Sequence, residues 1–252
     1  MTTIKDIYNC LDELAPFSLQ ESYDNSGLII GNMSREVTKV VIALDITTDT
    51  ANEAVLSDAE LVITHHPVIF SPLKRIDTAT PLGMLLTNNV AVISSHTNFD
   101  SAVMNDILCE KLSLTPKAPL CTENGTDIGF VCGCEKTSAK ELAKRAKEAL
   151  GCVSVRYVNT DKAVERVAVC SGSGGSFLHN AISLKCDAYI TGDVKHDVFI
   201  DAFNNDIALI DAGHFYTENI FCEYVKEYLQ KKFADVEFAV AKSNRDVTDY
   251  EI

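Results

Sequence analysis

The stretch Leu61-Val62-Ile63-Thr64-His65-His66-Pro67 joins a short apolar run to two histidines and a proline. Its first four residues are aliphatic or β-branched, which predicts a buried strand of the kind found in parallel sheets. In open α/β sheets, ligands gather at the carboxyl ends of the strands. The stretch therefore predicts an α/β fold and a polar site at the end of this strand.

Two further apolar runs end in the same way. Val90–Ser95 is followed by His96-Thr97-Asn98-Phe99-Asp100, and Ile207–Asp211 is followed by Ala212-Gly213-His214-Phe215-Tyr216-Thr217-Glu218. Three strand ends thus deliver four of the six histidines, together with two carboxylates. We expect these side chains to lie close together, because strand ends meet at one edge of a parallel sheet.

Strand-like and helix-like segments alternate along the whole chain, which predicts α/β lobes with mostly parallel or mixed sheets. The other expected strands are Val40–Asp45, Ile128–Cys132, Val167–Cys170 and Ala188–Thr191. The expected helices are Thr3–Leu14, Asp49–Leu56, Pro81–Asn88, Ser101–Leu112, Ser138–Leu150, Ser176–Leu184 and Thr217–Phe233.

The segment Thr115–Asp127 contains two prolines and a Glu-Asn-Gly turn, so it is the expected boundary between two lobes. The predicted lobes are residues 1–125, with His65, His66 and Asp100, and residues 126–252, with His214 and Glu218. The metal site is expected at strand ends between the lobes, and the C-terminal helix is expected to pack back on the first lobe.

Composition excludes several classes of protein. The net charge of −14 argues against a nucleic-acid surface, which needs clustered Lys and Arg. No apolar run reaches the roughly 18 residues that span a bilayer, and the start lacks the basic flank of a signal peptide. Nine cysteines without a repeated C-x-x-C pair predict reduced, mostly buried thiols. We therefore expect a cytoplasmic protein that binds neither membrane nor nucleic acid.

The polar residues at the strand ends have the composition of a metal site. Pro67 keeps His66 out of the helical region, so both adjacent imidazoles can turn toward neighbouring ions. His214 and Glu218 share a helix face if a helix begins at His214. Three histidines and two carboxylates exceed one ordinary zinc site and suit two ions. A hydrogen-bonded turn is the alternative interpretation of the His65-His66 pair.

Six motifs in order resemble those of the Nif-three-like dinuclear-metal proteins, often catalogued as type 2 GTP cyclohydrolase I or its homologues. Two of these motifs are His65-His66-Pro67-Val68-Ile69-Phe70 and His96-Thr97-Asn98-Phe99-Asp100, which follow the predicted strands that end at Thr64 and Ser95. The other four are Tyr23-Asp24-Asn25-Ser26-Gly27-Leu28, Ser171-Gly172-Ser173-Gly174-Gly175-Ser176, Thr191-Gly192-Asp193-Val194-Lys195-His196-Asp197 and Gly213-His214-Phe215-Tyr216-Thr217-Glu218. The resemblance covers nearly the whole length of the chain.

This resemblance implies a fold of two interlinked α/β lobes and a homohexameric ring whose metal sites face an internal cavity. It also implies that His65 and Asp100 hold one metal, that His66 and His214 hold the other, and that Glu218 bridges them. The sequence departs from the family in two places. Asp127 stands where relatives tend to have Arg, and Tyr23 stands where Trp is usual.

Further residues carry weaker predictions. Ser171, Gly172, Gly174 and Gly175 form a glycine-rich turn that suits an anion at a helix N-terminus, or simply a tight turn. Asp193 and His196 follow another strand and are also candidates for the substrate or anion site, where they could orient the ligating imidazoles or act as acid or base groups. The alternative for Asp193 is a helix cap. His96 is the candidate catalytic residue, placed to move a proton, with a structural role as its alternative.

We expect a metal-dependent hydrolase that uses a metal-activated water, with two divalent ions about 3.5–4 Å apart. The resemblance implies cyclohydrolase chemistry on a nucleotide or pterin-type ring. The rival hypothesis is a non-enzymatic, metal-binding hexameric scaffold or metal carrier. The expected ligands leave coordination positions open for water, and this feature and the glycine-rich turn favour the enzyme. Asp127, in place of an Arg that could bind an anionic substrate, favours the rival. Zinc, iron and manganese all suit this mixture of ligands.

Overall fold

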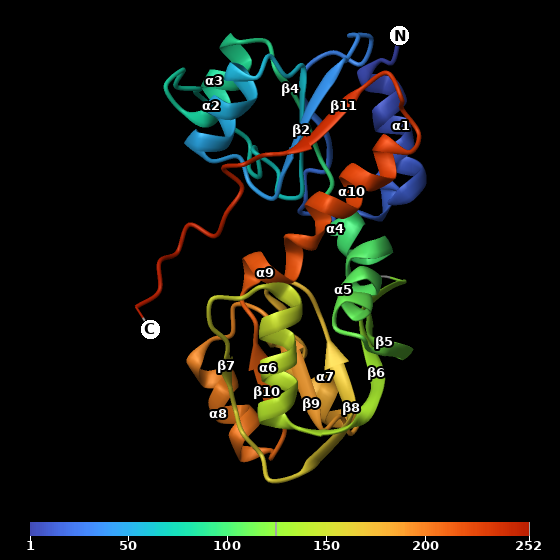
Figure 1. Cartoon of the computed structure of the whole chain (residues 1–252), viewed down its shortest axis with the longest axis vertical. Coiled ribbons are helices and arrows are strands. Elements are labelled where there is room, and N and C mark those ends of the chain that lie inside the picture. The colour runs from blue at the N-terminus through green and yellow to red at the C-terminus, as the bar shows by residue number, and fades with distance from the viewer. Residues whose placement is uncertain (124, 252) are drawn as a thin grey trace. The chain divides into compact units, whose positions relative to one another are not determined.

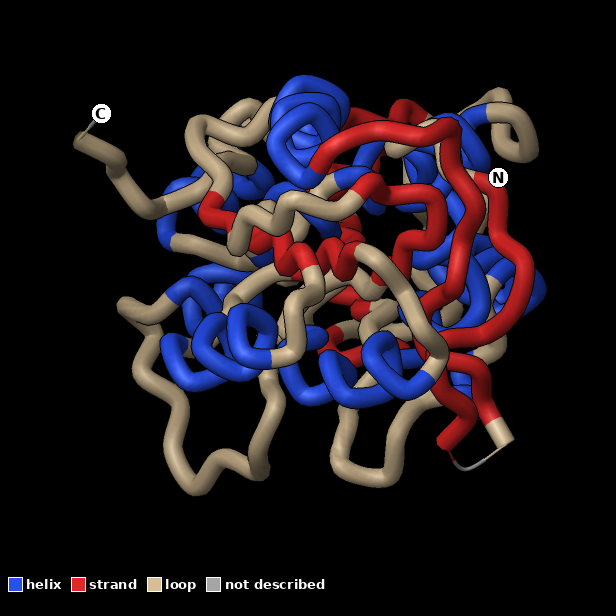
Figure 2. Tube along the Cα trace, turned by 90° about the horizontal axis from the view of Figure 1, so that it is seen from below, coloured by secondary structure: helices blue, strands red, loops and turns tan. Residues whose placement is uncertain are grey.

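The computed structural model describes residues 1–123 and 125–251, and in it the chain forms two compact units (Figure 1). Unit 1 comprises residues 1–102 and 221–245, and unit 2 comprises residues 103–220 and 246–252. Figure 2 shows the strands in red and the helices in blue, and both kinds of element occur throughout the chain. The predicted α/β fold class is confirmed.

Unit 1 is built on a five-stranded sheet with the order β1-β4-β3-β2-β11. Its strands are β1 (Gly27–Ile30), β2 (Lys39–Ala43), β3 (Leu61–Thr64), β4 (Ala91–Ser94) and β11 (Glu237–Val240). Parallel pairing joins β4, β3, β2 and β11, and β1 is antiparallel to β4. The parallel strands therefore end at one edge of the sheet.

Helices cover both faces of this sheet. On one face lie α2 (Thr48–Leu56) and α3 (Pro81–Thr87), whose Ala51, Ala54 and Leu85 pack against β2, β3 and β4. Figure 1 shows α1 (Ile4–Leu14) and α10 (Ile220–Gln230) on the other side of the sheet. Each helix buries an apolar stripe at helical spacing, Ile4, Ile7 and Leu11 in α1 and Phe221, Val225 and Leu229 in α10.

Two short segments complete the helical part of unit 1. They are η1 (Phe17–Leu19) and α4 (Thr97–Phe99). The π-helical turn η2 (Asp100–Met104) follows α4 and continues into α5 (Asn105–Lys111), so the chain passes from unit 1 to unit 2 inside a helical segment. None of the helices in residues 1–123 and 125–251 is both long and apolar enough to cross a membrane.

Unit 2 has a six-stranded mixed sheet with the order β5-β6-β8-β9-β10-β7. The strands are β5 (Thr115–Glu123), β6 (Thr126–Ser138), β7 (Arg156–Tyr157), β8 (Ala163–Val169), β9 (Ala188–Thr191) and β10 (Ala208–Asp211). The central strands β8, β9 and β10 are parallel. Antiparallel pairs flank them on both sides, β5–β6–β8 at one side and β7 at the other.

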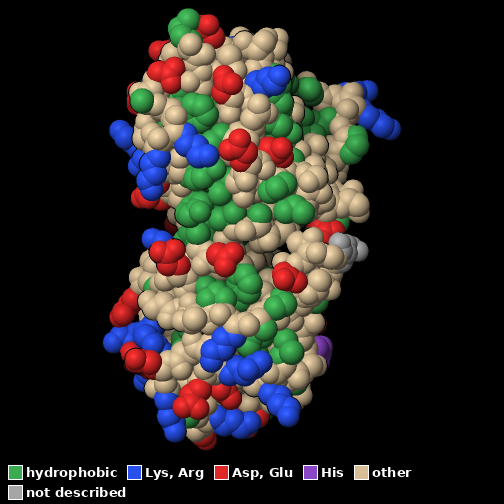
Figure 3. Space-filling model, turned by 90° about the vertical axis from the view of Figure 1, so that its right-hand side faces the viewer, with side chains coloured by type: hydrophobic (Ala, Val, Ile, Leu, Met, Phe, Trp, Pro, Cys, Tyr) green, Lys and Arg blue, Asp and Glu red, His purple; other side chains and the backbone are tan. Residues whose placement is uncertain are grey.

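Both faces of this second sheet are also covered. The helices α5 and α6 (Ala139–Leu150) pack on one face, and α7 (Leu178–Ser183) and α8 (His196–Asn204) pack on the other. The remaining helical segments are η3 (Gly174–Phe177) and α9 (His214–Glu218). Acidic and basic side chains are interspersed over the face shown in Figure 3.

The structure contradicts the prediction of a lobe boundary at Thr115–Asp127. Residues 115–123 form β5, which pairs antiparallel with β6, so the segment is one arm of a hairpin. β5 is the edge strand of its sheet, and an edge strand tolerates Pro116 and Pro119 because half of its N–H groups need no partner. Asn124, in the Glu-Asn-Gly turn, lies outside the described residues.

The units also divide elsewhere than at the predicted position 125/126. The first crossing lies between Ala102 and Val103, and the chain returns to unit 1 at Phe221. The reason is that helix α10 and strand β11 complete the sheet and core of unit 1, although they come late in the sequence. The nine cysteines all lie in the described residues and form no disulfide bond there, and Cys121 and Cys134 are the two half-exposed ones.

Candidate metal centre

The first group of candidate ligands lies in unit 1, at the ends of β3 and β4. His65 follows β3 directly and is fully buried, and His66 is half-buried. His96 precedes the short helix α4, and Asp100 follows it. One ring nitrogen of each of His65, His66 and His96 lies within 4.8 Å of the others. The adjacent strand ends therefore bring three imidazoles together, as the sequence predicts.

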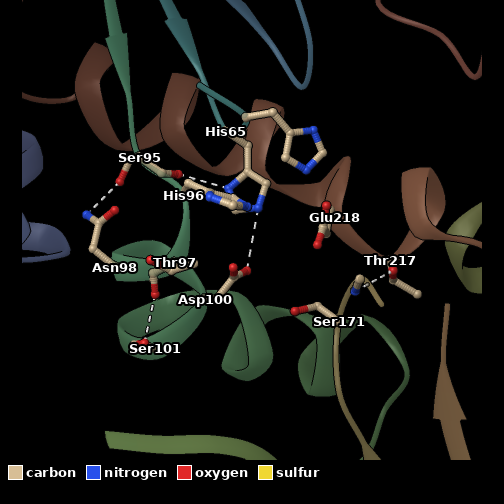
Figure 4. Close-up of polar contacts among 12 residues, drawn as sticks. His65, Ser95, His96, Thr97, Asn98, Asp100, Ser101, Ser171, Thr217 and Glu218 are labelled. Carbon is tan, nitrogen blue, oxygen red and sulfur yellow. Dashed lines mark hydrogen bonds and ion pairs between the residues drawn. The ribbon is translucent and has the colours of Figure 1, made fainter. Parts of the chain in front are cut away.

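Asp100 belongs to the same group. Its Oδ1 atom lies 3.5 Å from Nε2 of His65 (Figure 4). The helical turn at α4 places it there, because the N–H groups of Phe99 and Asp100 both donate to the carbonyl of His96. Unit 1 thus presents three imidazoles and one carboxylate to a small volume.

Each of these three imidazoles is held through its Nδ1 atom. Nδ1 of His65 lies 2.9 Å from the carbonyl oxygen of Ser95, an atom that can only accept a hydrogen bond. Nδ1 of His66 lies 2.7 Å from Oδ1 of Asp45, and Nδ1 of His96 lies 2.8 Å from Oδ1 of Asp24. With the proton on Nδ1, each neutral ring presents its lone pair at Nε2.

Asp24 is the most strongly perturbed acid of this group. Burial acts to raise its pKa, but hydrogen bonds from His96 and Thr97 outweigh burial and hold the pKa of Asp24 well below its usual value. Its Oδ2 atom accepts hydrogen bonds from Thr97 and Ser26 as well. Asp24 is therefore an ionised carboxylate that orients His96.

The second group of candidate ligands lies in unit 2, on α9. This helix begins at His214 after β10, and Nε2 of His214 lies 2.8 Å from Oε2 of Glu218, one helical turn later. Nδ1 of His214 lies 2.8 Å from Oδ2 of Asp193, which repeats the arrangement in unit 1. Glu218 is 4% exposed.

The glycine-rich turn packs against this second group. A Cβ atom added to Gly172, whose φ is +59°, would lie 2.0 Å from Oε1 of Glu218. The N–H of Gly172 donates to Oγ1 of Thr217. The N–H of Ser171 donates to Asn105, and that of Gly174 donates to Thr191. These contacts are those of a tight turn, and the anion site at Ser171, Gly172, Gly174 and Gly175 stays a prediction.

Two other predicted residues are separated by the structure. Asp193 has a φ of 51° and accepts from His214, so it acts as the partner of an imidazole rather than as a helix cap. His196 is exposed at the first position of α8. Asp127 accepts a hydrogen bond from Thr122 within the β5–β6 hairpin.

The donor atoms fit divalent transition metals. Imidazole nitrogens with a carboxylate suit zinc, iron and manganese. Metal-ligating histidines almost always donate their other ring N–H to a carboxylate or carbonyl. His65, His66, His96 and His214 all have this arrangement, with Nε2 of two of them facing a carboxylate oxygen. Asp45 and the role of Asp24 as the partner of an imidazole are not among the residues predicted from the sequence.

Comparisons with known proteins found relatives over nearly the whole chain. The chain matches the family model Duf34/NIF3 (NGG1p interacting factor 3) over residues 2–247. It is 33% identical over 261 residues to a Clostridium perfringens protein named GTP cyclohydrolase 1 type 2 homolog, covering 98% of this chain and 99% of that protein. It is 37% identical over 238 residues to a Helicobacter pylori protein named GTP cyclohydrolase 1 type 2, covering 91% and 92%.

Solved structures share the fold. A Staphylococcus aureus hypothetical protein matches with a TM-score of 0.91 and 25% identity, over 99% of both chains. A Bacillus cereus protein related to NIF3 matches with a TM-score of 0.88 and 22% identity, also over 99% of both chains. The family match spans both groups of histidines and carboxylates described above, and the chain accordingly belongs to the Duf34/NIF3 (NGG1p interacting factor 3) family.

Proposed function

We propose that this chain is a metal-dependent hydrolase that binds two divalent transition-metal ions through His65, His66, Asp100, His214 and Glu218. The observation that carries the proposal is the common arrangement of the histidines, each fixed through Nδ1 by an oxygen acceptor. This arrangement favours metal ligation because it directs the Nε2 lone pairs toward the other donors. The pairing of ligands with ions that the resemblance implies is part of the proposal.

The protein's own groups have distinct roles in this proposal. When bound, divalent ions of this kind polarise the bond under attack and activate water. Ser95, Asp45 and Asp193 hold the ligating rings through Nδ1 and orient their Nε2 atoms toward the site. His96, held by the ionised Asp24, is a general acid or base that takes up or gives up a proton at Nε2.

The substrate class in this proposal follows the names of the relatives. Curated relatives are named GTP cyclohydrolase 1 type 2 or homologues of it. We propose hydrolysis of a C–N bond in a nucleotide or pterin-type ring. An acidic protein can hold such an anionic substrate because bound cations reverse the local field.

A non-enzymatic metal carrier or scaffold is the second candidate function. One observation favours it: Asp127, at the position where the resemblance leads one to expect Arg, carries a carboxylate bonded to Thr122. A carboxylate there would repel an anionic substrate.

Elemental analysis combined with a turnover assay tests the proposal. Protein purified without chelators should contain close to two transition-metal ions per chain and should hydrolyse GTP or a related ring. Glu218→Ala should lose both ions and the activity. Glu223→Ala is the matched control, because Glu223 is an exposed residue of α10 that pairs with Lys226. Two bound ions without turnover of any nucleotide or pterin would support the carrier.

A further inference from the structure

Two exposed aromatic side chains of unit 1 lie beside the histidine group. Tyr23 is 63% exposed and Phe70 is 49% exposed. Their ring centroids are 6.3 Å apart with an interplanar angle of 49°. The Phe70 ring in turn lies 6.2 Å from the His96 ring at 75°. Tyr23, Phe70 and His96 therefore form a continuous row of rings that ends at the histidines.

Hydrogen bonds hold this row in place on both sides. Asn25 Nδ2 donates to the carbonyl of Ile69 at 2.6 Å, which ties the segment before Phe70 to the segment after Tyr23. Asp24 accepts from both His96 and Thr97, and it is the chain neighbour of Tyr23. The rings thus keep their position relative to His96 although two of them face solvent.

Exposure of this kind suits a planar ligand. Aromatic faces are large apolar surfaces, and a flat heterocycle covers them at little cost in conformational entropy. Stacking on an aromatic side chain is tolerant of the chemical substituents of the heterocycle, because every base has a π-face. A ring stacked on Phe70 would lie next to His96, the group proposed to move a proton.

We propose that Tyr23 and Phe70 form a stacking platform that binds the planar heteroaromatic ring of the substrate beside His96. This inference rests on the proposed function and adds to it the residues that select a flat ring over other anionic molecules. The platform acts on binding and orientation, so its loss raises KM more than it lowers kcat.

A single-fluorophore experiment tests the platform, because the chain contains no Trp. Tyr23→Trp places the sole indole on the platform, and Phe203→Trp places it on a 70% exposed residue of α8 in unit 2 as the control. GMP is the probe, and ribose 5-phosphate is the probe that lacks the ring. GMP should quench the indole of Tyr23→Trp with saturation, ribose 5-phosphate should not, and the indole of Phe203→Trp should show neither effect.

A second pair of variants measures the contribution of the platform. Phe70→Leu keeps apolar bulk but removes the π-face, and in the Tyr23→Trp background it should weaken GMP binding by roughly tenfold or more. Phe203→Leu should leave binding unchanged. Absence of quenching in Tyr23→Trp, or equal quenching by ribose 5-phosphate, would overturn the platform. A fall in molecular mass with Phe70→Leu at unchanged GMP affinity would overturn it too, and would assign the surface to a second copy of the chain.

The same measurements separate this inference from the proposed function. Quenching is a binding signal that needs no turnover, so saturable quenching with no hydrolysis would leave the platform standing and remove the hydrolase. Hydrolysis of GTP with an unchanged KM in Phe70→Leu would support the hydrolase and remove the platform.

Discussion

The carboxylate of Glu218 lies against the backbone of Gly172, at a place where even one additional carbon atom has no room. A Cβ atom at position 172 would lie 2.0 Å from Oε1 and 3.1 Å from the carboxyl carbon of Glu218. Because the N–H of Gly172 also donates to Thr217, the turn and the last residues of α9 are fixed to each other. The position of a candidate metal ligand thus depends on a glycine in a distant part of the sequence.

Gly172→Ala tests this dependence. The new methyl group should push the Glu218 carboxylate aside, and a φ of +59° adds strain of about 1 kcal/mol or more for a residue with a Cβ. We expect a lower melting temperature and a loss of bound metal, measured by calorimetry and elemental analysis. Gly175→Ala is the control, because its Cβ would meet only Val198 at an ordinary distance of 3.8 Å. Equal effects of the two substitutions would contradict the argument.

Asp193→Asn tests the orientation of His214. Loss of the charged partner at 2.8 Å from Nδ1 should weaken metal binding by roughly 10- to 100-fold, the usual effect of removing the partner of a ligating imidazole. Metal competition with a coloured chelator measures the affinity. Asp197→Asn, in the first turn of α8, is the matched control. Unchanged affinity in Asp193→Asn would show that the hydrogen bond does not support ligation.

His96→Ala distinguishes proton transfer from ligation. If His96 moves a proton, the variant should keep its metal content and lose about 10²–10⁴-fold in turnover. Loss of metal together with activity would make His96 a ligand, in line with its distance from His65 and His66. Loss of thermal stability alone would leave it a structural residue that positions Asp24.

The stability of unit 1 should depend on pH through Glu53. Burial acts to raise the pKa of Glu53, but hydrogen bonds from the backbone of Lys242 and from the backbone and side chain of Ser243 outweigh burial and lower the pKa. A lowered folded-state pKa gives stability that is present above the unfolded value, about 4.3, and lost as pH falls through the folded value. Glu53→Gln should flatten the fall in melting temperature between roughly pH 5 and pH 3. Glu227→Gln, on α10, is the control and should not.

Assembly provides a separate prediction that depends on the resemblance. Light scattering at micromolar concentration should give a mass near six times 27.6 kDa. A monodisperse sample at 27.6 kDa would remove the hexamer and, with it, the cavity that the resemblance implies.

Local sequence determines much of this fold. The predicted strands Leu61–Thr64 and Ala188–Thr191 coincide with β3 and β9, because buried parallel strands are short, continuous apolar runs. In contrast, β11 was missed because it is a strand through its pairing with β2, which lies nearly two hundred residues earlier in the sequence. Helix α8 was missed because it is only nine residues long, and its apolar residues Val198, Phe199 and Ala202 cover about one helical turn.

The candidate site also contains residues that the sequence predicts and residues that it does not predict. Each proposed ligand follows a strand, and Asp45 could have been found by that rule, since it ends the predicted strand Val40–Asp45. The role of Asp24 was not accessible, because its contact with His96 joins residues 72 apart in sequence. Strand ends can be read from a sequence, whereas pairings between loops depend on the tertiary fold.

The late position of β11 has a consequence for the order in which the protein is made. The ribosome completes all six strands of unit 2, the last of which ends at Asp211, before it adds Glu237–Val240. Until then the outer edge of β2 has backbone N–H and C=O groups without their strand partner, a surface that invites pairing with other chains. The sheet of unit 1 is thus completed after the sheet of unit 2, although its first strands are made first, and its open edge at β2 is exposed for longer during synthesis.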